Sequence, residues 1–453
     1  MSLNLSFLGG AGTVAGSRYL LESEGAAILV DVGLFQGLKQ HRLRNWAKFP
    51  KEPRSIGAVV LTHAHIDHSG YLPALARDGF AGSVHCSDAT ADLCRILLPD
   101  AAMLQEQDAA FANRHGFSKH KPALPLYTTA DAELALKRLR PLAFAAPRRL
   151  PGGAEIVLRR AGHILGAAIV ECRWAETTVV FSGDLGRPQD PIMLPPEPVK
   201  AADYLLVEST YGNRKHAATD PAELLGTILA ATVKRGGTLL IPAFAVGRAQ
   251  MVLFYLGELA RQGRLGVPVY LDSPMAIDAG ALLVDHADDH RLSVEECRTL
   301  AKVARYVRDP DGSKALTADP APKVIISASG MATGGRVLHH LKRYAPDPQS
   351  TILFAGFQAA GTRGEAMVAG ATAIKIHGDY VPVRAEVKNL SELSAHADAD
   401  EVLAWLRHFE RPPKRTFVVH GEPIAADILR HRIKDELGWA AEVPEHLSTA
   451  LLD

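Results

Sequence analysis

The sequence has few cysteines, and they are scattered along the chain. No two of the four form a Cys-x-x-Cys pair, so neither a zinc ribbon nor a disulfide framework is indicated. Long apolar runs are absent too, because the longest are strand-length and fall far below the roughly 20 residues of a membrane span. The first residues lack a basic segment followed by an apolar core, which is the pattern of a signal peptide. We therefore expect a cytoplasmic protein with no membrane partner.

Net charge of either sign is also lacking, since 50 Lys and Arg residues balance 50 Asp and Glu residues. A nucleic-acid binder usually has a basic excess, so the balance weighs mildly against a polyanionic substrate. Metal ions or a local group of arginines could supply positive charge that the total conceals. With 47% apolar residues among 453, the chain can bury one or two sizeable cores.

The predicted order of strands and helices changes along the chain. Residues 1–62 read as short strands separated by glycine-rich turns. A helix is expected over 131–139, and further strands are expected within 155–207. After about residue 208, strand-like runs alternate with helical stretches. That alternation is typical of βαβ units on a mostly parallel sheet. The last part, from about residue 383, again predicts strands and helices in turn.

The strongest chemical signal is a cluster of four metal-binding side chains within six positions: His63, His65, Asp67 and His68. It follows the expected strand 58–61, whose end can turn several side chains toward one point. Imidazole and carboxylate are suitable donors for zinc, and a mixed set is typical of catalytic sites. His63 and His65 can share one metal, while Asp67 and His68 are placed to reach a second. A loop that is merely rich in histidine is the less favoured alternative.

Further ligands should lie at other strand ends. His163 follows the expected strand 155–160, and Asp184 follows the expected strand 178–181. A carboxylate can bridge two metals through its two oxygens, which favours Asp184 as a bridge. Asp31, after another strand, is interpreted as a group that orients a ligand. Each taken alone could equally be a turn residue or a helix cap.

Together these residues resemble the metallo-β-lactamase superfamily. Three later motifs are similar to those of its β-CASP branch: Glu208 in Val-Glu-Ser-Thr-Tyr-Gly, His396 in Leu-Ser-Ala-His-Ala-Asp, and His420 in Val-Val-His-Gly-Glu. The branch comprises nucleic-acid-cleaving enzymes, and the chain looks closest to compact bacterial RNA-degrading enzymes related to the cleavage-and-polyadenylation endonuclease. The resemblance implies an α/β fold, an αββα sandwich at 1–207 and 383–453 with a β-CASP domain on a mostly parallel sheet inserted at 208–382.

The resemblance also implies roles for the site residues. One zinc would take His63, His65 and His163, and the other would take Asp67, His68 and His420. Asp184 would bridge the two zincs together with a hydroxide, and manganese would suit the same ligands. Such a pair of ions activates water and neutralises phosphate charge. The resemblance thus implies two metal ions per chain.

The three later motifs indicate which substrate is cleaved. A histidine at the position of His420 goes with RNA cleavage in this family, so RNA is favoured over DNA. His396 would be the general acid that protonates the leaving 3′ oxygen, and Glu208 would orient it. Cleavage would leave 5′-phosphate and 3′-hydroxyl ends. Asp67 and Asp184 would join them in the catalytic centre.

Two weaker signals lie in the insert. A glycine-rich segment with Ser327, Ser329, Thr333 and Arg336 ends a strand and opens a helix, which suits a backbone cradle for phosphate or a plain tight turn. It is not a P-loop, because Gly-Lys-Ser/Thr is missing. Arg248 near another helix start is either a phosphate clamp or a solvated helix residue.

Two other functions stay open from the sequence. A hydrolase of small esters or thioesters would use the metal cluster but would give no task to Glu208, His396 or the insert. An inactive RNA-binding subunit is the second alternative, and the filled ligand positions argue against it. Endonucleolytic and 5′-exonucleolytic cutting both stay open, as does a homodimer.

Overall fold

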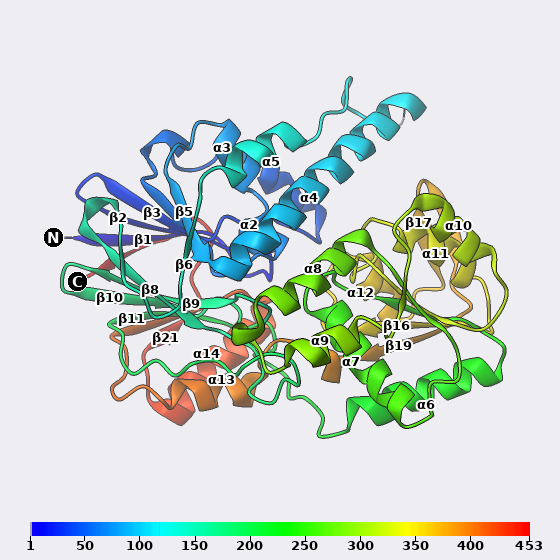
Figure 1. The fold of residues 1–453 in the computed structure, drawn as a ribbon. Helices are drawn as coiled ribbons and strands as arrows, with labels where there is room; N and C mark the ends of the chain where they lie inside the picture. Colours follow the sequence, from blue (N-terminus) through cyan, green and yellow to red (C-terminus); the bar gives the residue numbers. More distant parts are fainter. Residues whose placement is uncertain (1, 117) are drawn as a thin grey trace. The chain divides into compact units, whose positions relative to one another are not determined.

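The computed structural model describes residues 2–116 and 118–453, which form two compact units. The first unit comprises Met1–Lys215 and His396–Asp453, and the second comprises His216–Ala395 (Figure 1). Because the first unit combines both ends of the chain, the second is an insertion within it. The predicted domain limits at 208 and 383 were drawn from sequence motifs, whereas the two units are defined by how compactly the chain packs. The predicted limits therefore stay predictions.

The first unit contains two sheets. One has the strand order β22-β1-β2-β3-β4-β5-β6. Its first strands pair antiparallel, and β3 to β6 pair parallel, so the carboxyl ends of β3 and β4 lie at the same edge. The strands are β1 (Leu3–Gly9), β2 (Arg18–Ser23), β3 (Ala26–Val30), β4 (Ala58–Val60), β5 (Ser83–Ser87), β6 (Leu139–Leu142) and β22 (Thr449–Leu452).

The other sheet of this unit has the order β21-β20-β11-β10-β9-β8-β7. Strands β10, β11 and β20 pair parallel, while β9 pairs antiparallel with both β8 and β10, so β8 points the same way as β10. The strands are β7 (Arg148–Arg149), β8 (Glu155–Arg160), β9 (Ala168–Trp174), β10 (Thr177–Phe181), β11 (Tyr204–Glu208), β20 (Arg415–Val419) and β21 (Ala441–Glu442).

The two sheets pack face to face over one apolar core. Side chains from both sheets form a single buried cluster, in which the rings of Phe7 and Phe417 lie 5.0 Å apart. Helices α3 (Leu72–Arg77), α4 (Asp88–His115) and α5 (Thr129–Leu136) cover one sheet, and α13 (Ala399–Leu406) and α14 (Pro423–Leu437) cover the other (Figure 1). The predicted αββα sandwich is confirmed.

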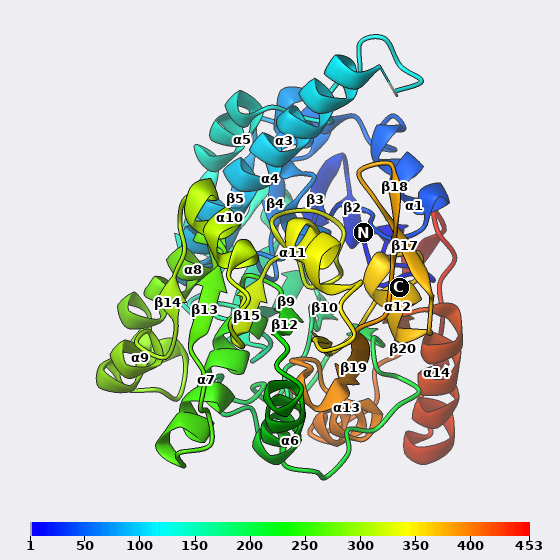
Figure 2. The same ribbon diagram turned by 90° about the vertical axis from the view of Figure 1, so that its right-hand side faces the viewer.

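The second unit is built on a parallel sheet with the order β14-β13-β15-β12-β16-β19, as predicted for the insert (Figure 2). Its central strands are buried throughout, because helices cover both faces. The strands are β12 (Leu239–Pro242), β13 (Val269–Asp272), β14 (Arg305–Tyr306), β15 (Val324–Ser327), β16 (Thr351–Ala355) and β19 (Glu386–Leu390). The longer helices are α6 (Pro221–Lys234), α7 (Arg248–Arg261), α8 (Pro274–Asp285), α10 (Pro310–Ala318) and α11 (Val337–Tyr344).

One predicted helix is shorter than its apolar pattern suggests. The sequence predicts a helix over 131–139, but α5 ends at Leu136 and β6 begins at Leu139, which pairs with Val84 of β5. A capping box between Thr128 and Asp131 sets the start of the helix. Its end is set by sheet pairing with a strand about fifty residues earlier, which local periodicity does not record.

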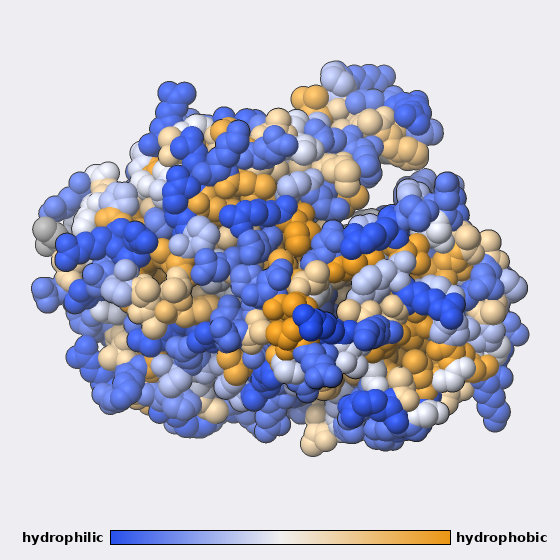
Figure 3. All heavy atoms as spheres, viewed as in Figure 1, coloured by the Kyte–Doolittle hydropathy of each residue, from blue (hydrophilic) through white to orange (hydrophobic). Residues whose placement is uncertain are grey.

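Among the described residues, none of the helices combines the length and apolar character that crossing a membrane requires. The face shown in Figure 3 is mostly hydrophilic, with apolar side chains in small scattered groups.

Candidate metal centre

The predicted ligands meet at one edge of the two sheets in the first unit. His63 follows β4, His163 follows β8, Asp184 follows β10 and His420 follows β20. All four residues are at most 3% exposed. The parallel strands of each sheet deliver these loops to the same edge, as the carboxyl ends of parallel strands do in α/β sites.

The first group of ligand atoms surrounds one oxygen of Asp184. Oδ2 of Asp184 lies 3.5 Å from Nε2 of His63 and 3.6 Å from Nε2 of His163. Nδ1 of His65 lies 3.1 Å from Nε2 of His63 and 3.2 Å from Nε2 of His163. The ligand atoms of these four residues are all within 4.8 Å of one another. That spacing places four donors around one point.

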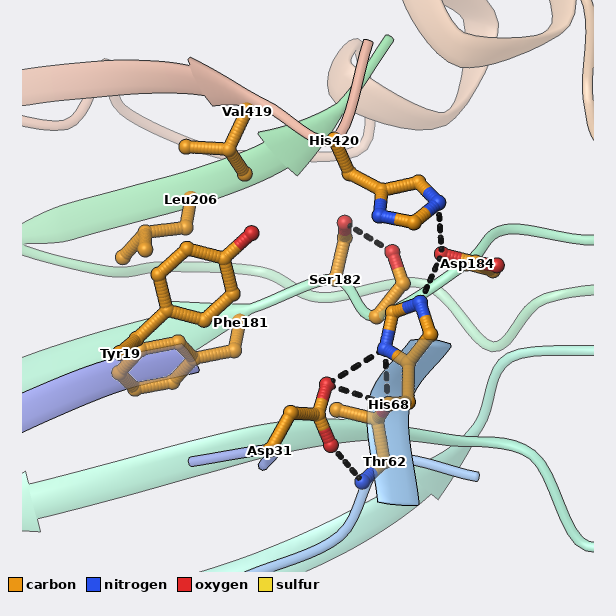
Figure 4. A pocket seen from close by; sticks show the side chains of 11 residues that line it. Tyr19, Asp31, Thr62, His68, Phe181, Ser182, Asp184, Leu206, Val419 and His420 are labelled. Atoms are coloured by element: carbon orange, nitrogen blue, oxygen red, sulfur yellow. Dashed lines mark hydrogen bonds and ion pairs between the residues drawn. The ribbon is translucent and has the colours of Figure 1, made fainter. Parts of the chain in front are cut away.

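The second group surrounds the other oxygen of the same carboxylate. Oδ1 of Asp184 lies 3.2 Å from Nε2 of His68 and 3.5 Å from Nε2 of His420 (Figure 4). Oδ2 of Asp67 lies 4.0 Å from Nε2 of His68 and 3.9 Å from Nε2 of His420. Asp184 therefore faces both groups, one oxygen to each.

The chemistry of these residues fits a metal site. Burial lowers the pKa of His63 well below its ordinary value and that of His420 to about 3, which favours the neutral imidazole that offers a lone pair to a metal. Burial alone would raise the pKa of Asp184, but His420, His68 and His63 hold it well below its ordinary value. Buried imidazoles around an ionised carboxylate are the donor set that divalent transition metals prefer.

Asp31 holds His68 from the side opposite Asp184. Oδ1 of Asp31 accepts a hydrogen bond from the backbone N–H of Thr62 at 2.7 Å. Oδ2 of Asp31 accepts from the Thr62 hydroxyl at 2.8 Å and lies 2.7 Å from Nδ1 of His68 (Figure 4). This contact points Nε2 of His68 toward Asp184, which is how a carboxylate orients a metal-binding histidine. Asp31 and His420 also adopt left-handed backbone conformations, with φ of 58° and 47°. Such conformations are uncommon for these residue types, and the surrounding structure must hold them.

Ser17 belongs to the same network, and the sequence patterns do not single it out. Its hydroxyl lies 2.8 Å from Nδ1 of His420, and its backbone N–H donates to the carbonyl of Asp67 at 2.9 Å. Its carbonyl accepts from the N–H of Gly33 at 3.0 Å. Ser17 immediately precedes β2, whereas the search for ligands followed the ends of strands. A hydroxyl at the start of a strand carries no motif that could have revealed it.

A carboxylate–histidine pair stands beside the metal groups. Nδ1 of His396 lies 3.1 and 3.2 Å from the two carboxylate oxygens of Glu208 and 4.0 Å from Oδ2 of Asp184. Glu208 is only 1% exposed, and the N–H groups of Leu185 and Thr210 donate to it at 2.7 and 3.3 Å. The pair joins residues 188 positions apart. Because Nδ1 faces Glu208, Nε2 is the ring nitrogen directed away from the carboxylate.

A small cavity lies between the sheets, behind the second group of ligands. Apolar side chains of Phe181, Leu206 and Val419 line it together with Tyr19 (Figure 4). Burial raises the pKa of Tyr19, so its phenol is neutral there. The inner side of the centre is therefore largely apolar, which strengthens the electrostatic interactions among the buried ligands.

The residues predicted to bind phosphate all lie in the second unit. Ser329 organises the glycine-rich loop, because its Oγ lies 3.1 Å from Thr333 Oγ1 and accepts from the Thr333 N–H at 3.1 Å. Arg248 is buried at the start of α7. Ser327 and Arg336 both contact Asp272, a residue that the sequence patterns do not single out. Ser327 donates to the Asp272 carbonyl at 3.0 Å, and Arg336 pairs with the Asp272 carboxylate at 2.6 Å. Their binding to RNA stays a prediction.

Family models match most of the chain. The metallo-β-lactamase superfamily model matches residues 11–303, the Beta-Casp domain matches 249–367, and a Zn-dependent metallo-hydrolase RNA specificity domain matches 380–444. The chain belongs to the β-CASP branch of the metallo-β-lactamase superfamily. Enzymes of this branch are metal-dependent nucleases, and this chain is one of them.

Individual relatives agree with the family. The chain is 37% identical to ribonuclease TTHA0252 of Thermus thermophilus over 91% of its own length and 92% of that protein. It is 29% identical to transcription termination factor FttA of Methanocaldococcus jannaschii, over 93% of this chain and 67% of the relative. A solved structure of a protein of unknown function from Enterococcus faecalis covers all of both chains with a TM-score of 0.53 at 14% identity, which shows a shared fold alone.

Proposed function

We propose that this chain is a zinc-dependent ribonuclease that hydrolyses RNA phosphodiester bonds and leaves 5′-phosphate and 3′-hydroxyl ends. The observation that carries the proposal is the placement of Asp184, whose oxygens face two separate groups of buried donors beside the His396–Glu208 pair. The ribonuclease relative and the RNA specificity match at 380–444 support RNA as the substrate.

Two zinc ions would be held by the two groups of donors. His63, His65 and His163 would bind the first, and Asp67, His68 and His420 the second, with Asp184 shared between them. When bound, such a pair lowers the pKa of a water molecule and neutralises charge that develops on the phosphate. Manganese would suit the same mixture of imidazole and carboxylate, so metal identity belongs to the test.

His396 would deliver a proton to the leaving 3′ oxygen. Its Nδ1 is held by Glu208 at 3.1 Å, so the proton for transfer is the one on Nε2. The N–H groups of Leu185 and Thr210 fix Glu208 in turn, and a general acid must be held in position to act within hydrogen-bond reach. A hydrolase acting on small esters would have no need of this pair.

The experiment compares three substrates: labelled single-stranded RNA, DNA of the same sequence, and a chromogenic ester, each with and without a chelator. We expect cleavage of RNA that the chelator abolishes and that added zinc restores. The new 5′ ends should be substrates for a 5′-phosphate-dependent exonuclease. A circular RNA, which has no 5′ end, separates endonucleolytic from exonucleolytic cutting. Turnover of the ester with intact RNA would overturn the proposal, as would RNA cleavage that is insensitive to metal removal.

A further inference from the structure

A loop next to the metal centre has a charge unlike that of the whole chain. Residues 32–51 contain no aspartate or glutamate, although the chain as a whole carries equal numbers of acidic and basic residues. The cations of this stretch are Lys39, Arg42, Arg44, Lys48 and Lys51. We call residues 35–48, with α1 (Lys39–Leu43) at their centre, the basic loop (Figure 2).

Most cations of this stretch have no counterion among the residues that the structure describes. Lys51 pairs with Glu22 at 2.7 Å. Within residues 2–116 and 118–453, no carboxylate forms an ion pair with Lys39, Arg42, Arg44 or Lys48. Elsewhere exposed cations commonly pair with carboxylates, as Lys314 does with Asp311 at 2.8 Å. The loop therefore presents uncompensated positive charge, which attracts a polyanion.

The base of the basic loop is held firmly. The side chain of Asn45 closes it, accepting from the N–H of Phe35 at 2.9 Å and donating to the Phe35 carbonyl at 2.8 Å. Buried Arg18 donates twice to the carbonyl of Gly33, at 2.9 and 2.8 Å. Its guanidinium carbon lies 4.9 Å from the ring centre of Phe35 and 4.2 Å from that of Tyr71. Positive groups on a loop anchored in this way lose little conformational entropy on binding.

The outer part of the loop also displays apolar side chains among its cations. Trp46 is 59% exposed and Leu43 is 57% exposed. Exposed tryptophan beside arginine and lysine is the combination that binds single-stranded nucleic acid, because bases stack on the ring while cations contact phosphates. Neither of these two side chains belongs to the apolar core of the first unit.

The residues just before the basic loop are attached directly to the segment that carries Asp67 and His68. The N–H of Val32 donates to the carbonyl of His68 at 2.7 Å, and the N–H of Leu34 donates to the carbonyl of Ile66 at 2.9 Å. Both acceptors belong to α2 (Ile66–Ser69), which carries Asp67 and His68. A strand of substrate leaving the metal centre past α2 would therefore meet the loop.

We propose that the basic loop is a binding platform for single-stranded RNA outside the catalytic centre. Lys39, Arg42 and Lys48 contact phosphates, and Trp46 stacks on a base. The platform rests on the proposed function, in that RNA is the polyanion brought to this edge. It lets a chain with no net charge hold a strongly charged substrate.

The test measures equilibrium binding of the full chain to labelled polyuridylate in EDTA, which prevents cleavage, over a range of salt concentrations. The platform variant carries Lys39→Ala, Arg42→Ala and Lys48→Ala together. We expect weaker binding and a log–log salt slope smaller by about 2, from three lost phosphate contacts on a single strand. Trp46→Ala alone should weaken binding about tenfold with an unchanged salt slope.

The matched control removes three exposed lysines from the same unit: Lys119→Ala, Lys121→Ala and Lys137→Ala. It should leave both the affinity and the salt slope at wild-type values. For cleavage, the platform variant should raise KM for RNA more than it lowers kcat. Far-ultraviolet circular dichroism and the melting temperature confirm that each variant folds.

The possible results distinguish failure of the platform from failure of the proposed function. Equal affinity and equal salt slope for the platform variant and the control overturn the platform, even if wild-type protein cleaves RNA. Binding of anionic vesicles but not RNA overturns it as well, in favour of a membrane surface. RNA binding that depends on the loop without any cleavage supports the platform and overturns the proposed function.

Discussion

The hydroxyl oxygen of Ser17 lies 2.8 Å from Nδ1 of His420, although 403 residues separate them in the chain. The same serine donates its backbone N–H to the carbonyl of Asp67. One residue immediately before β2 therefore contacts two proposed ligands of the second metal, His420 through its side chain and Asp67 through its backbone. Contacts of this kind orient an imidazole and select the nitrogen that faces the metal.

Replacing Ser17 by alanine should weaken the second metal site selectively. Loss of the contact to Nδ1 leaves His420 free to rotate, and comparable losses reduce metal affinity about 10- to 100-fold. Chelator competition followed by elemental analysis should show one metal retained and one lost early. Ser23→Ala, at the opposite end of the strand β2 that Ser17 precedes, serves as the control and should keep both metals. Equal metal retention in the two variants would contradict the assignment of Ser17.

His396→Ala should abolish most RNA cleavage while leaving metal content unchanged. Loss of a general acid typically reduces kcat by about 10² to 10⁴. Rapid-quench kinetics and elemental analysis measure the two quantities separately. His431→Ala removes a histidine from the exposed side of α14 and should change neither. Near-normal cleavage by His396→Ala would falsify the role proposed for this residue.

Gly33→Ala should distort the segment that carries Asp67 and His68. A Cβ at residue 33 would overlap the carbonyl group of Asp67, which is backbone and cannot rotate away. Overpacking of this kind costs about 1–3 kcal/mol in the free energy of unfolding, and we expect weaker metal retention as well. Thermal unfolding and chelator competition are the measurements.

The matched glycine is Gly280 on α8, where a Cβ would make an ordinary contact with Gln250. Gly280→Ala should leave stability unchanged or raise it slightly, because alanine favours a helix over glycine. If the two alanine variants melted at the same temperature, the close approach at Gly33 would have no energetic consequence.

Acid should destabilise the second unit through Asp272. Burial alone would raise the pKa of Asp272, but hydrogen bonds from His340, Ser313 and Arg336 lower it below its ordinary value. A carboxylate with a lowered folded pKa stabilises the fold above its unfolded pKa of about 3.9, and this contribution is lost as the pH falls through the folded value. Urea unfolding at pH 7 and between pH 4 and 2 should follow this loss.

Asp272→Asn should cost about 3 kcal/mol at pH 7, because it removes the buried carboxylate that Arg336 and His340 contact, and it should flatten the acid dependence. Asp311→Asn removes an exposed carboxylate that pairs with Lys314 and should change stability by less than about 1 kcal/mol. An unaltered acid dependence in Asp272→Asn would show that other groups govern unfolding at low pH.

Much of the architecture follows from local pattern. Continuous apolar runs at Leu239–Pro242 and Val324–Ser327 are fully buried strands of a parallel sheet, as their sequence predicts. The short strands are harder to predict from the sequence, since β5 is a mixture of small and polar residues and β6 contains a proline. Their pairing depends on neighbours far along the chain, so local propensity predicted a longer helix where β6 begins.

The sequence by itself pointed to a metal site, because four residues with metal-binding side chains lie within six positions after a strand. It also determined, through resemblance, that Glu208 and His396 belong to one centre. Only the tertiary structure decided that the oxygens of Asp184 face different ligand groups and that Ser17 supports His420. Those relationships arise where two sheets meet, and no spacing along a chain encodes which distant side chain will fill the remaining hydrogen bond of a buried histidine.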